Sequence, residues 1–176
     1  MVSSNNRMPE EVVLGPDEYE EIDSIGRWKL EHKLIEEHCS PLEPEIRKKS
    51  RDSSDRFDGI EYKVMLDPAT KPEQSSVKLR MIIPDNYPNE LPRVYPIDYQ
   101  IHFDHSNHTY RDKDGKVHMC MLFEEDWTED CTLAGLMVLS SIWMHKWMIW
   151  KREGRWPGKG RKHCIRCGNI GKNCTC

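Results

Sequence analysis

Three segments in the middle of the chain alternate apolar and polar side chains with a period of two. A period of two is typical of a β-strand that has one face in the core. The links between the segments are rich in proline, aspartate and asparagine, so the pattern predicts an antiparallel meander. The apolar positions are Ile60, Tyr62, Val64 and Leu66 in the first segment, Val77, Leu79, Met81 and Ile83 in the second, and Ile97, Tyr99, Ile101 and Phe103 in the third.

Two further segments have the apolar spacing of helices. The first runs from Asp17 to Cys39. Gly26 weakens its middle, so we expect the firm helix to begin near Ser24. Its expected inner face contains Ile25, Trp28, Ile35 and Cys39, widened by Leu30 and Leu34.

The second helical segment runs from about Thr132 to Arg152 and is strongly apolar. Asp130 or Thr132 suits the N-cap, and Gly154 suits the C-cap. Polar residues within it, among them Lys146, would be costly in a bilayer, so the pattern favours a buried core helix over a membrane span. The side chains expected to face the sheet are Leu133, Leu136, Met137, Trp143, Met144 and Trp147.

The order of these elements predicts an α+β fold in which the long helix covers the meander. Residues 1–16 are polar and aperiodic, and we expect them to form a flexible tail. Residues 17–158 form the expected folded domain, in which residues 40–58 are interpreted as a connector that holds at most one short helix. Residues 159–176 form a basic, cysteine-rich tail.

The composition limits the classes of function. The chain has 176 residues and a formal net charge of -4, which gives no overall basic field for duplex DNA or a membrane surface. It has seven cysteines, an odd number, and four of them lie at its end, unlike the framework of a disulfide-stapled secreted domain. The first residues lack the apolar core of a secretory signal. We therefore expect a cytoplasmic protein with reduced thiols.

Cys120 is the candidate nucleophile. It lies among apolar residues, between a polar turn and the acidic run Glu124–Asp126. A thiol in this setting is anchored by its neighbours, and the adjoining turn leaves backbone N–H groups free to face an oxyanion. The alternative is a buried cysteine that behaves as a small hydrophobe. Cys39 and Cys131 have no comparable setting and are interpreted as structural.

Motifs in a fixed order extend this hypothesis. They are Tyr87-Pro88 with Pro92, Gly115 ahead of Cys120, Trp127, and Thr132-Leu133. In this order they resemble the ubiquitin-conjugating (UBC-like) enzyme family over about residues 17–158. The resemblance implies an N-terminal helix, a four-stranded antiparallel meander, an active-site segment and a long C-terminal helix. It also implies that Cys120 takes the carboxyl end of a protein as a thioester from an activating enzyme and passes it to an amine.

The second half of the chain is similar to bacterial conjugating-enzyme relatives in antiphage defence operons of the CBASS type. The matching residues are His108-Thr109-Tyr110, the tryptophan-rich segment Trp143–Trp150 and the turn Gly154–Gly158. This resemblance implies that the protein acted on is either a ubiquitin-like modifier or a cGAS/DncV-like nucleotidyltransferase.

Two departures from the family pattern lie beside the thiol. Tyr110 stands where the family has the asparagine credited with supporting the oxyanion, and a phenol can still donate a hydrogen bond. The interval from Gly115 to Cys120 is longer by two residues, which predicts a bulge or a longer turn and brings His118 into the segment.

Three further residues are candidates for supporting roles. His118 is a candidate partner of the thiolate, or else an exposed strand histidine. His108 is expected to shape the turn by hydrogen bonding rather than to transfer protons. Glu153, by position only, is the candidate acidic group near the acceptor amine.

The cysteine-rich tail contains a separate motif. Cys-x-x-Cys-Gly followed by Cys-x-Cys can supply four thiolates, so the tail predicts a small structural zinc knuckle. The ligands would be Cys164, Cys167, Cys174 and Cys176, with His163 as a substitute. A disulfide or redox pair and an unliganded tail are the alternatives.

The region from Lys151 to Lys172 holds eight basic residues and one acid, Glu153. A solvated basic tail is one interpretation, and a docking surface for an acidic partner or a nucleic acid is another. Two alternatives to the enzyme therefore remain, a binding module and a catalytically idle scaffold of the same fold.

Overall fold

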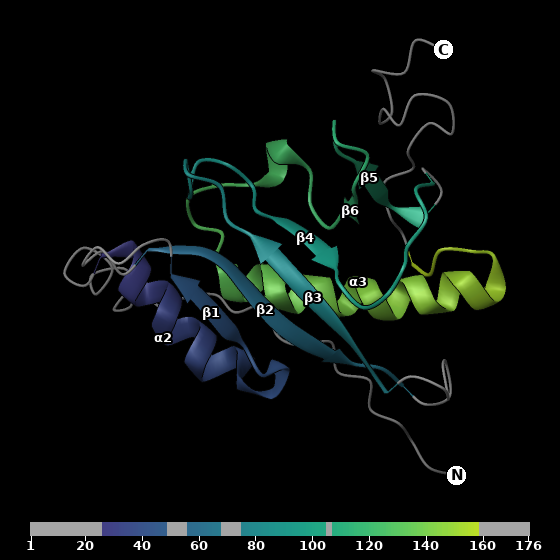
Figure 1. The fold of residues 1–176 in the computed structure, drawn as a ribbon, viewed down its shortest axis with the longest axis horizontal. Helices are drawn as coiled ribbons and strands as arrows, with labels where there is room; N and C mark the ends of the chain where they lie inside the picture. The colour runs from purple at the N-terminus through teal and green to yellow at the C-terminus, as the bar shows by residue number, and fades with distance from the viewer. Residues whose placement is uncertain (1–25, 49–55, 68–74, 105–106, 159–176) are drawn as a thin grey trace.

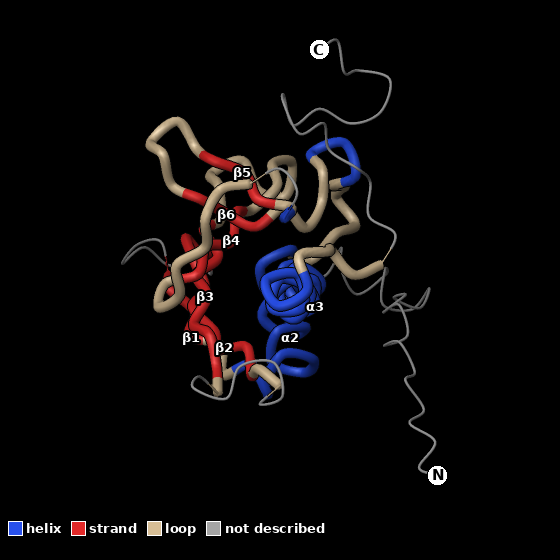
Figure 2. Tube along the Cα trace, turned by 90° about the vertical axis from the view of Figure 1, so that its right-hand side faces the viewer, coloured by secondary structure: helices blue, strands red, loops and turns tan. Residues whose placement is uncertain are grey.

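A four-stranded antiparallel sheet packs one face against two helices, as Figure 1 and Figure 2 show. The computed structural model describes residues 26–48, 56–67, 75–104 and 107–158 of the chain. The strands are β1 (Glu45–Lys48), β2 (Phe57–Met65), β3 (Ser76–Ile82) and β4 (Arg93–Pro96), in that order across the sheet. The covering helices are α2 (Arg27–Cys39) and α3 (Leu133–Glu153). The predicted α+β fold, with a helix, a four-stranded meander and a long final helix, is confirmed.

The third strand is predicted in the wrong place. Residues 97–104 form a loop, whereas β4 lies just before them. Pro96 has no N–H to donate to a ladder, and Asp98 ends the pairing because its side chain accepts the backbone N–H of Lys78 at 2.7 Å. Ile97 is 40% exposed, so the alternation that continues past Pro96 does not indicate a buried strand face.

The connector contains an edge strand that the sequence pattern missed. Residues Ser40–Leu42 form a short 3-10 helix, η1, as the connector interpretation allows. The strand β1 then pairs with β2, with Ile46 opposite Ile60. Four residues with one apolar side chain give too short an alternation to be recognised, and only the neighbouring strand supplies the pairing.

The helix α2 begins at Arg27 among the described residues, and residues 17–25 of its predicted range lie outside them. Its buried apolar side chains are Leu30, Leu34, Ile35 and Cys39. Trp28, expected on the inner face, is only partly buried, and its ring packs against Phe57 and Tyr87.

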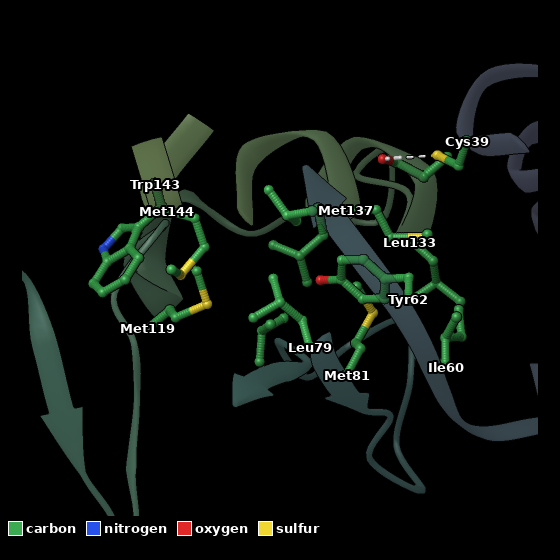
Figure 3. Packing of buried hydrophobic residues seen from close by; sticks show 14 of the residues in the cluster. Cys39, Ile60, Tyr62, Leu79, Met81, Met119, Leu133, Met137, Trp143 and Met144 are labelled. Carbon is green, nitrogen blue, oxygen red and sulfur yellow. Dashed lines mark hydrogen bonds between the residues drawn. The ribbon is translucent and has the colours of Figure 1, made fainter. Parts of the chain in front are cut away.

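The helix α3 forms as predicted. Thr132, not Asp130, is its N-cap and accepts the N–H of Gly135 at 3.1 Å, and Gly154 closes its end with a φ of 70°. All six side chains expected to face inward are buried. Figure 3 shows that Leu133 and Met137 of this helix point toward Tyr62, Leu79 and Met81 of the sheet. Among the described residues, no helix has the length and apolar character that crossing a membrane requires.

A buried carboxylate joins the two helices. Glu31 of α2 has no exposed surface, and it accepts the backbone N–H of Leu133 at 2.8 Å and the hydroxyl of Tyr87. Arg27 lies 2.7 Å from the same carboxylate and also donates to Tyr87 and to the backbone carbonyl of Glu129. Burial raises the pKa of Glu31, so these donors are what make an internal carboxylate tolerable.

We expect Glu31→Ala to lower the free energy of unfolding by about 3 kcal/mol, because it removes the anion paired with Arg27 and leaves the Tyr87 hydroxyl and the N–H of Leu133 without their acceptor. Urea denaturation of the full chain measures this loss. Glu36→Ala, on the exposed side of the same helix, should change stability by less than about 0.5 kcal/mol. Equal effects of the two substitutions would contradict the role given to the network.

Candidate active site around Cys120

Cys120 directly follows a small hairpin formed by β5 (Thr109–Arg111) and β6 (Val117–Met119). The hairpin lies beyond β4 at one end of the sheet, with β6 beside β4 (Figure 1). The longer interval ahead of the cysteine therefore becomes a hairpin with a regular register, closed by a turn in which Gly115 has a φ of 80°. The inserted residues add a ladder instead of a bulge.

The backbone of Cys120 is anchored by a single carbonyl group. The carbonyl oxygen of His108 accepts the N–H of Cys120 at 2.9 Å and the indole N–H of Trp143 at 3.0 Å. His108 holds this carbonyl in place with a φ of 55°, a left-handed conformation that is uncommon outside glycine. His108 thus shapes the turn through its backbone, in line with the sequence hypothesis.

The sulfur of Cys120 faces a small cavity of about 160 Å³. The long helix supplies one wall, and the turn after it supplies Trp156, whose ring lies 4.6 Å from the His108 ring and 5.6 Å from the Trp143 ring. Trp156 and its neighbours leave Cys120 only 6% exposed. The lining residues are His108, Cys120, Met121, Phe123, Leu139, Trp143, Lys146 and Trp156.

Tyr110 provides the polar partner of the thiol. Its side chain forms a hydrogen bond with Cys120, and this bond lowers the pKa of the thiol while it raises the pKa of the phenol. A hydroxyl that donates to a thiolate has this pair of effects. Burial acts the other way and is stronger, so the pKa of Cys120 rises to about 11. The resting site therefore holds a thiol at neutral pH.

His118 reaches the thiol only through Tyr110. Its Nε2 lies 3.2 Å from the carboxylate of Asp112, and its ring centroid lies 5.5 Å from that of Tyr110. Tyr95 of β4 donates to the same carboxylate at 2.7 Å. The His118 side chain is 14% exposed, so it is not an exposed strand histidine, and burial lowers its pKa. Asp112 thus ties the hairpin to β4 and holds the His118 ring against Tyr110.

The remaining sequence candidates lie away from the cavity. Glu153 is at the end of α3, with its side chain 43% exposed and paired with Arg152 at 2.7 Å. It does not line the cavity that Cys120 faces. Cys39 is fully buried, with its sulfur 3.7 Å from the carbonyl of Ala134, and Cys131 is partly buried beside Thr128. Both cysteines pack as structural residues.

Two residues of the site escaped the sequence analysis. Lys146 lines the cavity because it follows Leu139 and Trp143 by seven and three positions along α3, a spacing that places all three on one helix face. That spacing could have identified it. No spacing in the sequence identifies Asp112, because its partners Tyr95 and His118 lie on the separate strands β4 and β6.

The predicted zinc ligands Cys164, Cys167, Cys174 and Cys176, together with His163, lie outside the described residues. Within the described ranges, no group of three or more histidine, cysteine, aspartate or glutamate side chains could hold a metal ion. The zinc knuckle therefore stays a prediction.

We expect Tyr110→Phe to raise the pKa of Cys120 above about 11, because it removes the donor that stabilises the thiolate. The rate of alkylation by iodoacetamide at pH 8.5 should fall about fivefold, since a charge-assisted hydrogen bond contributes roughly 1.5–3 kcal/mol and the more basic thiolate recovers part of the loss. A pH profile of the rate measures the shift. Tyr95→Phe is the matched control, because that phenol contacts Asp112, and an unchanged profile for Tyr110→Phe would contradict the assignment.

A comparison with protein-family models identifies the family of this chain. Residues 42–164 match the family model of the Type II CBASS E2 protein, a range that includes the sheet, the hairpin, Cys120 and α3. The crystal structure of a ubiquitin-conjugating enzyme E2 from Plasmodium falciparum is similar, with 19% sequence identity, 80% of this chain and 92% of that chain covered, and a TM-score of 0.42. No curated protein matches the sequence at a significant level. Because the family model covers more than half of the chain, the protein belongs to the Type II CBASS E2 family of antiphage defence.

Proposed function

We propose that the protein carries an acyl group as a thioester on Cys120 and transfers it to an amine. Family membership supports an activity of the conjugating-enzyme type. The observation that carries the proposal is the pairing of Cys120 with Tyr110, because a phenol that donates to the sulfur stabilises the attacking thiolate. No such donor serves Cys39, whose sulfur faces a backbone carbonyl.

The first step exchanges one thioester for another. The Cys120 sulfur forms a bond to the acyl carbon, the carbonyl electron pair moves to oxygen, and the collapse of this intermediate expels the donor thiolate. Exchange between thioesters is close to isoenergetic, so the protein contributes mainly positioning and oxyanion stabilisation. Within the described residues, the backbone N–H groups of Met121 and Leu122 donate to no backbone carbonyl, which leaves them able to face the oxyanion.

Access to the sulfur requires Trp156 to move. The Trp156 ring lines the cavity and packs against the His108 ring, and a cysteine that is only 6% exposed admits no acylated protein in this conformation. The turn that bears this ring is bounded by Gly154 and Gly158, with φ values of 70° and 90°. An acyl donor would therefore displace the indole from His108 and Trp143, and the ring would return to shield the thioester from water.

The donor and acceptor are inferred from the resemblance. We propose that the donor is an activating enzyme or another protein thioester. The acyl group would come from a ubiquitin-like modifier or from the carboxyl end of a cGAS/DncV-like nucleotidyltransferase. The family match to antiphage defence supports this class of partner.

Covalent capture in the native host tests the proposal. The wild-type chain should carry a protein adduct that a thiol reagent releases, because a thioester exchanges with thiols. Cys120→Ser should hold the same protein as an oxyester that resists the thiol reagent, and Cys120→Ala should hold none. Cys131→Ser, which lies outside the cavity, is the matched control and should behave as wild type.

A catalytically idle scaffold is the second candidate function. The burial of the sulfur and its raised pKa favour it, because both slow attack by the thiol. The capture experiment separates the two functions. An equal yield of partner for Cys120→Ala and the wild type, without thiol-sensitive linkage, would support the scaffold and contradict the enzyme.

We also propose that the tail binds one structural zinc ion through Cys164, Cys167, Cys174 and Cys176. The support is the ligand type and spacing, since four thiolates form the commonest tetrahedral zinc shell. Elemental analysis of the purified full chain should find one zinc per chain, and Cys164→Ser should lower this content. A wild-type chain free of zinc after purification without chelators would contradict the proposal.

A further inference from the structure

The cavity beside Cys120 contains one cationic side chain. Lys146 is partly buried on α3, one turn beyond Trp143, and its side chain lines the cavity that the sulfur faces. Among the described residues that line it, no other lysine or arginine is present. Because the acyl carbonyl of a Cys120 thioester must lie next to the sulfur, this cavity is where its oxygen would find room.

The polar groups nearest the thiol already have other hydrogen-bonding or packing partners. Tyr110, which replaces the family asparagine, bonds to the sulfur itself and lines the neighbouring cavity instead of this one. The carbonyl oxygen of His108 is an acceptor and repels an oxyanion, and the His108 ring packs against Trp156. Besides the backbone N–H groups of Met121 and Leu122, the side-chain donor of this cavity that, among the described residues, has no such commitment is on α3.

We propose that the Lys146 ammonium donates a hydrogen bond to the oxyanion that forms on the acyl carbonyl at Cys120. This inference rests on the proposed function and adds the group that performs the task of the missing asparagine. As the thiolate attacks, the carbonyl electron pair moves to oxygen and the Lys146 N–H stabilises it. The pair returns when the leaving group departs, so Lys146 gains and loses no proton.

In this proposal, the charge of Lys146 acts on the acyl oxygen and not on the sulfur. The interaction that lowers the pKa of Cys120 against burial is the hydrogen bond from Tyr110. The rate of a reaction of the sulfur that forms no oxyanion should therefore not depend on Lys146. Alkylation by iodoacetamide is such a reaction, because it displaces iodide at a saturated carbon, whereas acylation by a thioester passes through an oxyanion.

The experiment compares these two reactions on the full chain. The acylation probe is the acetylglycine thioester of 2-mercaptoethanesulfonate, and intact-mass spectrometry follows the acetylglycyl group on the protein. Lys146→Met should slow acylation of Cys120 by roughly 100-fold, the loss typical of one oxyanion donor, and should change alkylation by less than about twofold. Lys146→Arg keeps the positive charge and should recover most of the acylation rate.

Lys151→Met is the matched control on the same helix. The Lys151 ammonium donates to the Tyr99 hydroxyl at 2.9 Å and does not line the cavity, so both reactions should keep their wild-type rates. This control distinguishes an effect that depends on the position of Lys146 from an effect of losing any positive charge on α3.

Three outcomes would overturn the inference. Equal slowing of both reactions by Lys146→Met would make Lys146 a structural residue, and no slowing of either would remove its role. An acetylglycyl group that moves from Cys120 to the Lys146 amine would make Lys146 an acceptor instead. If the wild-type chain is alkylated at Cys120 but takes no acyl group from the probe, the proposed function fails with it, and this result is distinct from the other three.

Discussion

The buried carboxylate of Glu31 lies where α2, the Tyr87-Pro88 turn and the start of α3 meet. It accepts the N–H of Leu133 at the first residue of α3, where the helix dipole favours a negative charge. Arg27 and Tyr87 supply the remaining donors. Because α3 forms a wall of the Cys120 cavity, the same interaction that joins the two helices also fixes where Leu139, Trp143 and Lys146 stand. The site is thus built partly on a helix that is anchored at its first residue.

The hairpin brings the other half of the site. Its strands hold Tyr110 opposite His118, and the carbonyl of His108 is shared between the Cys120 backbone and Trp143 of α3. The thiol is therefore fixed relative to both the hairpin and the helix. Under the proposed function, a sulfur held in this way would lose little freedom on attack, which would compensate in part for the unfavourable pKa that burial imposes.

Tyr110 and Lys146 line two different cavities. The phenol of Tyr110 bonds to the sulfur, whereas under the proposed function oxyanion stabilisation would fall to groups of the cavity that Cys120 lines. Burial makes each of these interactions stronger, because a hydrogen bond to a charged group is screened less in a site that excludes water. The same burial raises the free-energy cost of the thiolate, so the resting site favours the thiol.

The sequence alone determined the features that depend on local periodicity and caps. The core faces of β2, β3 and α3 and the ends of the long helix follow from spacing and turn chemistry. The tertiary structure decided the rest. It placed the last meander strand at Arg93–Pro96, because the Asp98 side chain accepts the N–H of Lys78 and ends the ladder there, and it paired Tyr110 with the thiol across a hairpin. Asp112 joined the site for the same reason, since contacts between distant segments depend on how whole elements pack and leave no period in the chain.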